Sequence, residues 1–306
     1  MIIISDTLDF KLNSRSAVAI GKFDGVHLGH RELMQTLMEK KEEGLMTCVF
    51  TFDPSPAVLF GMSDGKELTT KAEKRKIFEE MGIDVLVEFP LSTASAAIPA
   101  EDFVKDYLVE RLRAKWIVAG EDVSFGAKGT GNAALLNQMA ETCDFSVTTI
   151  SKIAVDGREI SSSYIRELVE SGEMEKAKKF LGTPYSISGE VSHGKKLGRT
   201  IGMPTINVLP GEDKLLPPKG VYYSSVVYNG VIYKAISNVG YKPTVTDEKI
   251  MGVESFLFDY EGDLYGKEVT ILLHAFKRPE MKFDSVEALK EQMHLDKLEG
   301  AKYLPN

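Results

Sequence analysis

Two histidines near the N-terminus are the first side chains whose type and spacing suggest chemistry. The chain has five histidines, and His27 and His30 stand three positions apart in GKFDGVHLGH (21–30), with Gly29 between them. A helical pattern begins directly afterwards, and the N–H groups and dipole at a helix N-terminus attract phosphate. Two imidazoles that face one phosphate chain can stabilise the charge that develops as pyrophosphate leaves. The pair therefore predicts a phosphate site.

The same two histidines have simpler interpretations. His30 could cap the helix while His27 fills a turn, and neither role needs a ligand. A zinc site is less favoured, because no third and fourth ligand follow at a suitable spacing.

Two further stretches carry residues that suit a nucleotide. GEDVSFGAKGTGN (120–132) holds four glycines and Lys128, and ISSSYIRELVESGEMEKAKKFLG (160–182) opens with three serines followed by Arg166. Serines favour a helix N-cap, and an arginine one turn inside the helix could reach a phosphate bound there. The alternatives are a surface loop and ordinary capping.

The second half of the chain has its own candidates. Thr205 and Asn207 alternate in PTIN, so a strand would place both oxygens on one face, where they suit Mg²⁺ and phosphate. Glu254 lies in the otherwise apolar VESF, where a carboxylate needs a partner or a catalytic role. The stretch 189–208 is rich in glycine and basic residues, as a flap over phosphates would be. Polar residues facing solvent, an outward glutamate and an exposed loop are the alternatives.

The elements that must position the first group alternate regularly. Five apolar runs rich in Val and Ile predict buried strands at 17–21, 47–52, 84–89, 116–120 and 145–150. Helical spacing lies between them at 31–43, 70–81, 100–112 and 132–143. This order predicts a Rossmann-like α/β domain with a parallel sheet covered on both faces, whose ligands bind at the carboxyl ends of the strands.

After Gly182 the pattern becomes that of a small antiparallel β-barrel. Six strand-like runs are separated by turns, of which Asn229-Gly230 is the strongest hairpin signal, and one helix follows at 285–301. Gly182 and Pro184 end the preceding helix. We therefore expect two domains, residues 1–182 and 183–306.

Composition narrows the class of function. The 306 residues are 43% hydrophobic and 27% charged, with a net charge of −8 and a pI near 5.3, which is typical of a globular protein and argues against nucleic acid as a partner. Cys48 and Cys143 lie among apolar residues, which predicts buried, reduced thiols in the cytoplasm. The MIII run is too short for a signal peptide, and no stretch is long enough to span a membrane.

The motifs resemble those of a known family. GKFDGVHLGH and ISSSYIR resemble the HxGH and ISSTxxR motifs of the nucleotidylyltransferase superfamily, and nearly the whole chain resembles the prokaryotic bifunctional riboflavin kinase/FAD synthetase family. The kinase half matches in order at GEVSHGKKLGRTIGMPTINV, PPKGVYYSSV, ISNVGYKPTV, VESFLFDYEGDLYGK and FKRPEMKF. The resemblance implies a nucleotidylyltransferase domain followed by a riboflavin kinase barrel with a C-terminal helix.

The resemblance also implies two reactions. Riboflavin and ATP give FMN and ADP, and FMN then attacks the α-phosphorus of a second ATP to give FAD and pyrophosphate. Mg²⁺ would accompany ATP, and neither nucleic acid nor a membrane would be a partner. Such transfers need positioning and charge stabilisation rather than a nucleophilic side chain.

For adenylyl transfer, the matched motifs assign residues to ATP. His27, His30 and Arg166 would act on its phosphates. The further ATP-binding residues would be Gly21, Phe23, Asp24, Gly29, Asp122, Ser162 and Ser163.

For the kinase, the resemblance implies that Glu254 takes the proton of the ribityl 5′-hydroxyl as that oxygen attacks the γ-phosphorus. Thr205 and Asn207 would hold Mg²⁺ and the ATP phosphates. The remaining assignments are Gly194, Lys196 and Gly198 to ATP, and Arg278 and Gln292, near Leu289, to the flavin. Pro243 and Thr244 belong to the same barrel motif.

Some positions depart from the family pattern. Ser55 stands where the family usually has a histidine, Tyr164 where it often has an arginine, Lys22 where a smaller polar residue is common, and Asn132 where an aspartate is frequent. They leave open a monofunctional riboflavin kinase with an inactive nucleotidyltransferase domain. A third possibility is a non-catalytic flavin or nucleotide sensor, which has no need of the HLGH, PTIN and VESF residues together.

Overall fold

The computed structural model describes residues 1–192, 203–243 and 249–303. The chain forms two compact units, Met1–Lys66 with Lys71–Ser161, and Glu67–Thr70 with Ser162–Asn306. The predicted phosphate-binding residues Gly194, Lys196 and Gly198 lie outside the described residues, as does Thr244. In the described part of the chain, no helix is long and apolar enough to cross a membrane.

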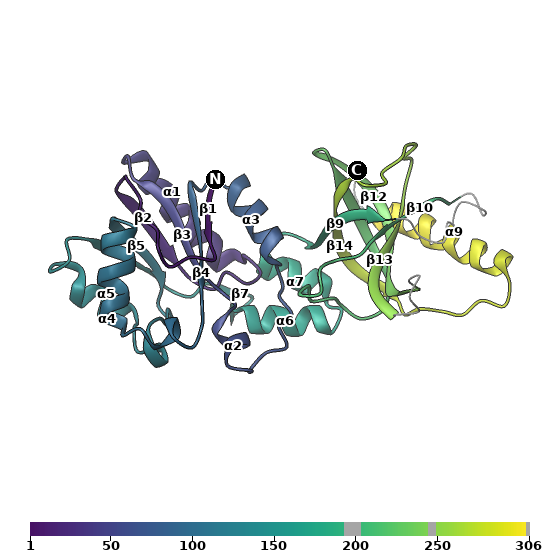
Figure 1. Cartoon of the computed structure of the whole chain (residues 1–306). Helices are drawn as coiled ribbons and strands as arrows, with labels where there is room; N and C mark the ends of the chain where they lie inside the picture. The colour runs from purple at the N-terminus through teal and green to yellow at the C-terminus, as the bar shows by residue number, and fades with distance from the viewer. Residues whose placement is uncertain (193–202, 244–248, 304–306) are drawn as a thin grey trace. The chain divides into compact units, whose positions relative to one another are not determined.

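The first unit is built on a six-stranded parallel sheet (Figure 1). The five predicted strands are confirmed. The N-terminal MIII run adds a sixth strand, which pairs with β4 at the sheet edge and was not predicted, because so short a run shows no periodicity. The strands lie in the order β1-β4-β3-β2-β5-β6, and their bounds are β1 Ile2–Ser5, β2 Ser16–Ile20, β3 Met46–Asp53, β4 Val85–Pro90, β5 Ala114–Gly120 and β6 Ser146–Ile150.

The predicted helices of this unit are present with one difference. The stretch 100–112 forms a short α4 that continues as a π-helical segment, Phe103–Arg111. A short antiparallel pair, β7 with β8, precedes the end of the unit. The bounds are α1 Leu28–Glu42, α2 Pro56–Leu59, α3 Lys71–Glu80, α4 Ala100–Asp102, α5 Ala133–Ala140, β7 Ala154–Val155 and β8 Arg158–Glu159, with 3₁₀ turns at Ser95–Ala97 and Ala127–Gly129.

Helices cover both faces of this sheet, as predicted. Successive residues of a strand point to opposite faces, so Val18 packs with Leu108 of the π-helical segment while Ala19 packs with Phe78 of α3. Cys48 is buried in the first of these clusters, whereas Cys143, also predicted to be buried, is only partly so because it lies just beyond the end of α5. Both thiols are unpaired.

Strand order determines where a ligand can bind in this unit. Strand β2 lies between β3 and β5, so the chain leaves β2 towards one side of the sheet and later returns on the other side. Parallel sheets bind ligands at the carboxyl ends of the strands beside such a reversal. The residues that follow Ile20 and those that follow Gly120 are therefore the candidates.

The second unit is a closed antiparallel barrel, preceded by two helices and followed by one (Figure 1). Helix α7 packs against α6 and against β9 and β14, and it ends at Gly182 in the left-handed conformation, as predicted. The barrel order is β10-β13-β12-β11-β14-β9. The bounds are α6 Ser162–Glu170, α7 Met174–Leu181, β9 Tyr185–Ser192, β10 Thr205–Val208, β11 Gly220–Tyr228, β12 Val231–Pro243, β13 Lys249–Leu257, β14 Glu268–Arg278 and α9 Val286–Tyr303.

Side chains along the barrel strands alternate between the buried interior and the outer face. The predicted hairpin joins β11 to β12, with Asn229 and Gly230 both at positive φ. On β13, Ser255 is fully buried, and its hydroxyl lies 2.6 Å from that of Ser237. Its neighbours Glu254 and Phe256 point to the opposite, outer face, where Phe256 packs near α9.

Candidate active sites

The loop between β2 and α1 holds the histidine pair in a strained backbone. Phe23 and the buried, β-branched Val26 have φ values of 52° and 40°, which such residues rarely adopt. Gly21 makes room for this conformation, because a Cβ there would come within 2.9 Å of the Phe23 ring. That ring lies edge-on to His30, with 5.2 Å between the ring centroids. This strained loop conformation therefore holds the Phe23 ring against His30.

His27 is the N-cap of α1. Its Nδ1 accepts a hydrogen bond from the backbone N–H of His30 at 3.3 Å. The two rings are stacked, with 3.6 Å between centroids and 13° between planes. The alternative of simple capping assigned the N-cap to His30, whereas the structure assigns it to His27. Because Nδ1 accepts, the proton of the neutral ring is on Nε2, which is left as a donor.

Gly29 allows the His27 ring to lie over the helix terminus. A Cβ at Gly29 would be 3.3 Å from Cε1 and 3.4 Å from Nδ1 of His27. Only a residue without a side chain leaves this contact unstrained.

Burial keeps both imidazoles neutral. Desolvation lowers the pKa of His27 to about 4, against an opposing effect of the Asp122 charge. Desolvation also holds the pKa of His30 well below its usual value, and the neighbouring His27 and Lys74 act in the same direction. Among the described residues, His30 Nδ1 and Arg31 Nε are buried without a hydrogen-bond partner. Two such nitrogens beside a helix N-terminus suit an anion.

Charged side chains from the neighbouring strands lie at the same edge of the sheet. Asp122 follows β5, and its negative charge is near enough to raise the pKa of His27. Lys152 follows β6, with its Nζ 3.8 Å from Asp122 and 3.3 Å from Glu159. Lys152 and Arg31 were not predicted. In the sequence, Lys152 is marked only by its position after a strand end, and Arg31 only by its position after the HLGH motif.

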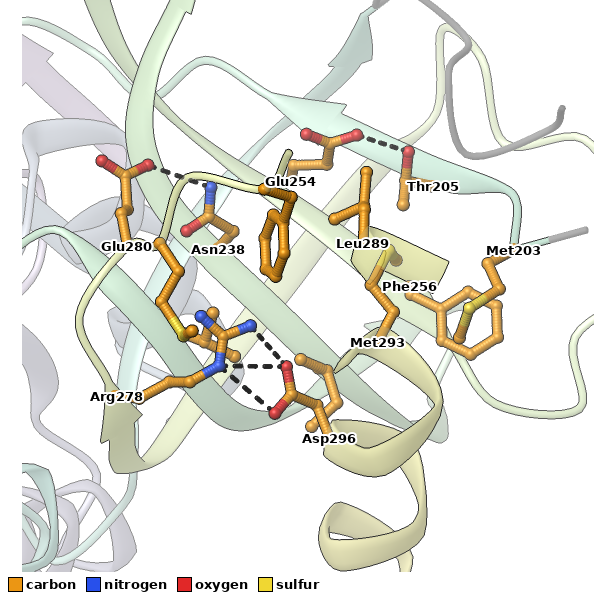
Figure 2. A pocket seen from close by; sticks show the side chains of 14 residues that line it. Met203, Thr205, Asn238, Glu254, Phe256, Arg278, Glu280, Leu289, Met293 and Asp296 are labelled. Carbon is orange, nitrogen blue, oxygen red and sulfur yellow. Dashed lines mark hydrogen bonds and ion pairs between the residues drawn. The ribbon is translucent and has the colours of Figure 1, made fainter. Parts of the chain in front are cut away.

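The second unit has a pocket of about 260 Å³ on the outer wall of the barrel, which Figure 2 shows between the strands and α9. One part of the lining is apolar and the other polar. The apolar residues are Met203, Val221, Ile236, Phe256, Met281, Phe283, Leu289 and Met293, and the polar ones are Thr205, Asn238, Glu254, Arg278, Glu280 and Asp296.

Glu254 lies at one end of this pocket, and residues with oxygen-bearing side chains stand on the two neighbouring strands. The Thr205 hydroxyl donates to Glu254 Oε1 at 2.6 Å (Figure 2). Asn207 of β10 stands opposite Glu254 in the ladder and two positions from Thr205, which confirms that Thr205 and Asn207 share a face. On the other side of β13, Asn238 of β12 also stands opposite Glu254. Three neighbouring strands thus bring these side chains together.

The Thr205 and Asn207 side chains fit a divalent cation. The Thr205 hydroxyl donates its hydrogen bond to Glu254, which leaves its oxygen lone pairs for a cation, and Asn207 carries an amide oxygen of the kind that Mg²⁺ prefers. Among the described residues, no group of three or more His, Cys, Asp and Glu side chains could hold a metal ion.

The other end of the pocket is held by a buried ion pair between β14 and α9. Arg278 Nη2 lies 2.6 Å from Asp296 Oδ2, and Nε lies 3.2 Å from the same oxygen. Gln292 donates to Asp296 Oδ1 at 3.0 Å, so it reaches the pocket through Asp296, whereas Arg278 and Leu289 line it directly. Asp296 was not predicted. Its one signal is the helical spacing of four from Gln292.

Comparisons with known proteins cover both units. Residues 9–164 match the family described as FAD synthetase, and residues 181–304 match the family described as riboflavin kinase. The bifunctional riboflavin kinase/FMN adenylyltransferase of Listeria monocytogenes is 36% identical over 95% of this chain and 93% of its own length. That of Bacillus subtilis is 36% identical over 96% and 94%. The chain belongs to the bifunctional riboflavin kinase/FMN adenylyltransferase family.

Its activities are those of a riboflavin kinase and an FMN adenylyltransferase, so the single-activity kinase and the sensor are set aside. A solved structure from Streptococcus pneumoniae, described as a macrolide-efflux protein, shares the fold with a TM-score of 0.84 and 31% identity, over 97% of both chains. The efflux description belongs to that protein. Both matched families of this chain are flavin enzymes.

The structure gives a local reason for one of the departures from the family pattern. Tyr164 of α6 packs edge-on against Phe180 of α7, with 5.0 Å between the rings, so an aromatic residue suits this position. Ser55 occupies the N-cap position of α2. Ser162, Ser163 and Arg166 lie in the first turns of α6, where the serine-rich stretch predicted a helix start. Their contact with ATP stays a prediction.

Proposed function

We propose that riboflavin binds in the barrel pocket and that Glu254 is the base of the kinase reaction. The observation that carries this proposal is the position of Glu254 at one end of a pocket that has a large apolar surface and an Arg278–Asp296 ion pair at its other end. The isoalloxazine ring would pack on Phe256, Leu289 and Met293, and the ribityl chain would extend towards Glu254. Arg278, held by Asp296, offers N–H donors to the flavin carbonyl oxygens.

The kinase step needs one proton acceptor and a fixed geometry. Glu254 accepts the proton of the ribityl 5′-hydroxyl while that oxygen attacks the γ-phosphorus of ATP, and ADP leaves. The hydrogen bond from Thr205 orients the carboxylate for this transfer. Mg²⁺ bound by Thr205 and Asn207 would neutralise phosphate charge. Gly194, Lys196 and Gly198 are proposed to contact the ATP phosphates.

Adenylyl transfer is proposed to occur at the end of β2. The neutral His27 would donate from Nε2 to an ATP phosphate, and the α1 N-terminus with His30 would stabilise charge on the departing pyrophosphate. Gly21, Phe23, Asp24 and Gly29 shape the loop, and Asp122 is proposed to contact the nucleotide. Ser162, Ser163 and Arg166 are proposed to act on the same phosphates.

These assignments divide the chain into an adenylyltransferase domain, 1–182, and a kinase domain, 183–306. The matched ranges 9–164 and 181–304 support that division, although the compact units separate at Ser161. Unpaired cysteines and the use of ATP support a cytoplasmic location.

The test uses one variant for each site, with the other activity as its control. The purified enzyme is incubated with ATP, Mg²⁺ and either riboflavin or FMN, and the flavins are separated by chromatography. Glu254→Gln is expected to lower FMN formation by about 10²- to 10⁴-fold and to leave the conversion of FMN to FAD intact. His30→Ala is expected to do the reverse. Unchanged FMN formation in Glu254→Gln would show that the base is another group.

A further inference from the structure

Asn238 is a polar side chain of the riboflavin pocket with no role in the mechanism above. Its Oδ1 is buried, and among the described residues no group donates a hydrogen bond to it. Almost none of the surface of this oxygen is open to solvent. A buried carbonyl oxygen without a donor is unfavourable, so such an atom in a binding pocket indicates a ligand that brings an O–H or N–H group.

The carboxamide is held on its other side by Glu280. Asn238 Nδ2 donates to Glu280 Oε1 at 3.2 Å, as Figure 2 shows. Glu280 can come this close because residue 240 is glycine. A Cβ at Gly240 would lie only 2.2 Å from the same Glu280 oxygen. The NH₂ group is therefore committed to Glu280, and the oxygen is the half of the amide that is left for a ligand.

The position of Asn238 identifies the part of the flavin that it can meet. Asn238 and Glu254 stand directly opposite each other on β12 and β13, and opposed residues have their Cβ atoms about 5 Å apart. Glu254 is assigned to the terminal hydroxyl of the ribityl chain, so the groups within reach of Asn238 are the secondary hydroxyls next to it. Each of these hydroxyls is a hydrogen-bond donor.

We propose that Asn238, oriented by Glu280, accepts a hydrogen bond from a secondary hydroxyl of the ribityl chain and makes the kinase selective for flavins with a polyol side chain. The inference rests on the riboflavin site proposed above and adds a specificity-determining residue to it. A pocket that hydrogen-bonds a substrate hydroxyl discriminates strongly against analogues that lack it.

The test compares two substrates that differ only in those hydroxyls. The probe is 7,8-dimethyl-10-(5-hydroxypentyl)isoalloxazine, which keeps the ring and the terminal hydroxyl but has no secondary hydroxyls. In Asn238→Leu, kcat/KM for riboflavin is expected to fall by about 10- to 100-fold, whereas kcat/KM for the probe stays within about threefold of the unmodified enzyme. An equal loss for both substrates would overturn the proposal, because it would indicate a structural role.

Three control variants distinguish a lost hydrogen bond from a change in the shape of the pocket. Ile236→Val trims the same pocket two positions away on β12 and is expected to affect both substrates alike. Glu280→Gln, which keeps an oxygen acceptor for Asn238, should preserve the preference for riboflavin, and Glu280→Ala should reduce it. The two Glu280 variants give a result even if Asn238→Leu does not fold.

N3-methylriboflavin tests the ring imide as the alternative donor. If Asn238→Leu lowers kcat/KM for riboflavin but not for this analogue, the partner of Asn238 is the ring N–H and the proposal is wrong. Failure of the unmodified enzyme to phosphorylate riboflavin would instead contradict the proposed function, so the two failures are distinguishable.

Discussion

His27 caps α1, and in the proposed site the same ring also donates to an ATP phosphate. Its Nδ1 caps α1, and this hydrogen bond places the proton on Nε2, where a phosphate oxygen would need a donor. Burial keeps the ring neutral at physiological pH, so a negatively charged ligand meets a fixed dipole and not a mobile proton. Glycine at position 29 is what permits the geometry.

The lowered pKa of His27 predicts how stability depends on pH. The unfolded residue has a pKa near 6.5 and the folded one about 4, so between these values the unfolded chain binds a proton that the folded loop rejects. Stability present above pH 6.5 is therefore lost as the pH falls towards 4, by about 3 kcal/mol for this group.

The measurement is urea unfolding at several pH values, followed by the fluorescence of Trp116, the one tryptophan of the chain, in β5. In His27→Asn, which retains an N-cap acceptor, the unfolding free energy should fall less between pH 6.5 and 4. An identical slope in both proteins would contradict a desolvated His27.

Gly29→Ala separates stability from activity at the same site. The higher helix propensity of alanine, about 1 kcal/mol over glycine, offsets the strain of the new contact, so the melting temperature should change little. The new methyl group presses on the His27 ring at 3.3 Å, so FAD formation from FMN is expected to drop by about tenfold. Phosphorylation of riboflavin by the same variant is the internal control. Unaltered FAD formation would show that the ring position is not critical.

At the scale of elements, helix α9 is joined to the barrel by a buried charge pair. Asp296 is 2% exposed and lies against Arg278 at the end of β14. The same helix carries Glu299, which forms an exposed ion pair with Lys277. One helix therefore offers a buried and an exposed pair on neighbouring turns.

Asp296→Ala tests what the buried pair contributes. Removal of one partner leaves Arg278 without its counterion, which is expected to destabilise the second unit by about 3 kcal/mol and to raise the KM for riboflavin. Glu299→Gln is the matched control and should leave both quantities nearly unchanged, because an exposed pair contributes little. Equal effects of the two substitutions would contradict a role of the buried pair in the pocket. Chemical denaturation and steady-state kinetics provide the measurements.

At the scale of the whole molecule, the two matched families, residues 9–164 and 181–304, lie largely in different compact units, each with its own sheet. Parallel strands and covering helices build the first, and the closed barrel builds the second. The proposed base of the kinase and the histidine pair lie in different units, so loss of one activity should leave the other in place.

A mixture of two inactive-site variants tests this independence. Glu254→Gln is expected to make little FMN, and His30→Ala is expected to convert little FMN to FAD. Because FMN made by one protein can diffuse to the other, an equimolar mixture is expected to turn riboflavin into FAD, which chromatography would detect. No FAD from the mixture, with each variant keeping its remaining activity, would show that FMN must pass within a single chain.

The order of elements and the location of the motifs were predictable from the sequence. Strand runs such as 47–52, the hairpin at Asn229-Gly230 and the helix end at Gly182 depend on side-chain periodicity and on turn residues, which act over a few neighbouring positions. Family motifs lie within short stretches as well, so His27, Glu254 and their neighbours could be named in advance.

Only the tertiary structure decided which of these residues meet. Strand order brings Asp122 and Lys152 together at one edge, and barrel register sets Asn238 opposite Glu254. Asp296 meets Arg278 because α9 folds back onto the barrel. These contacts join segments that are distant in the chain, and their geometry follows from packing and from strand pairing, for which local sequence patterns carry no information.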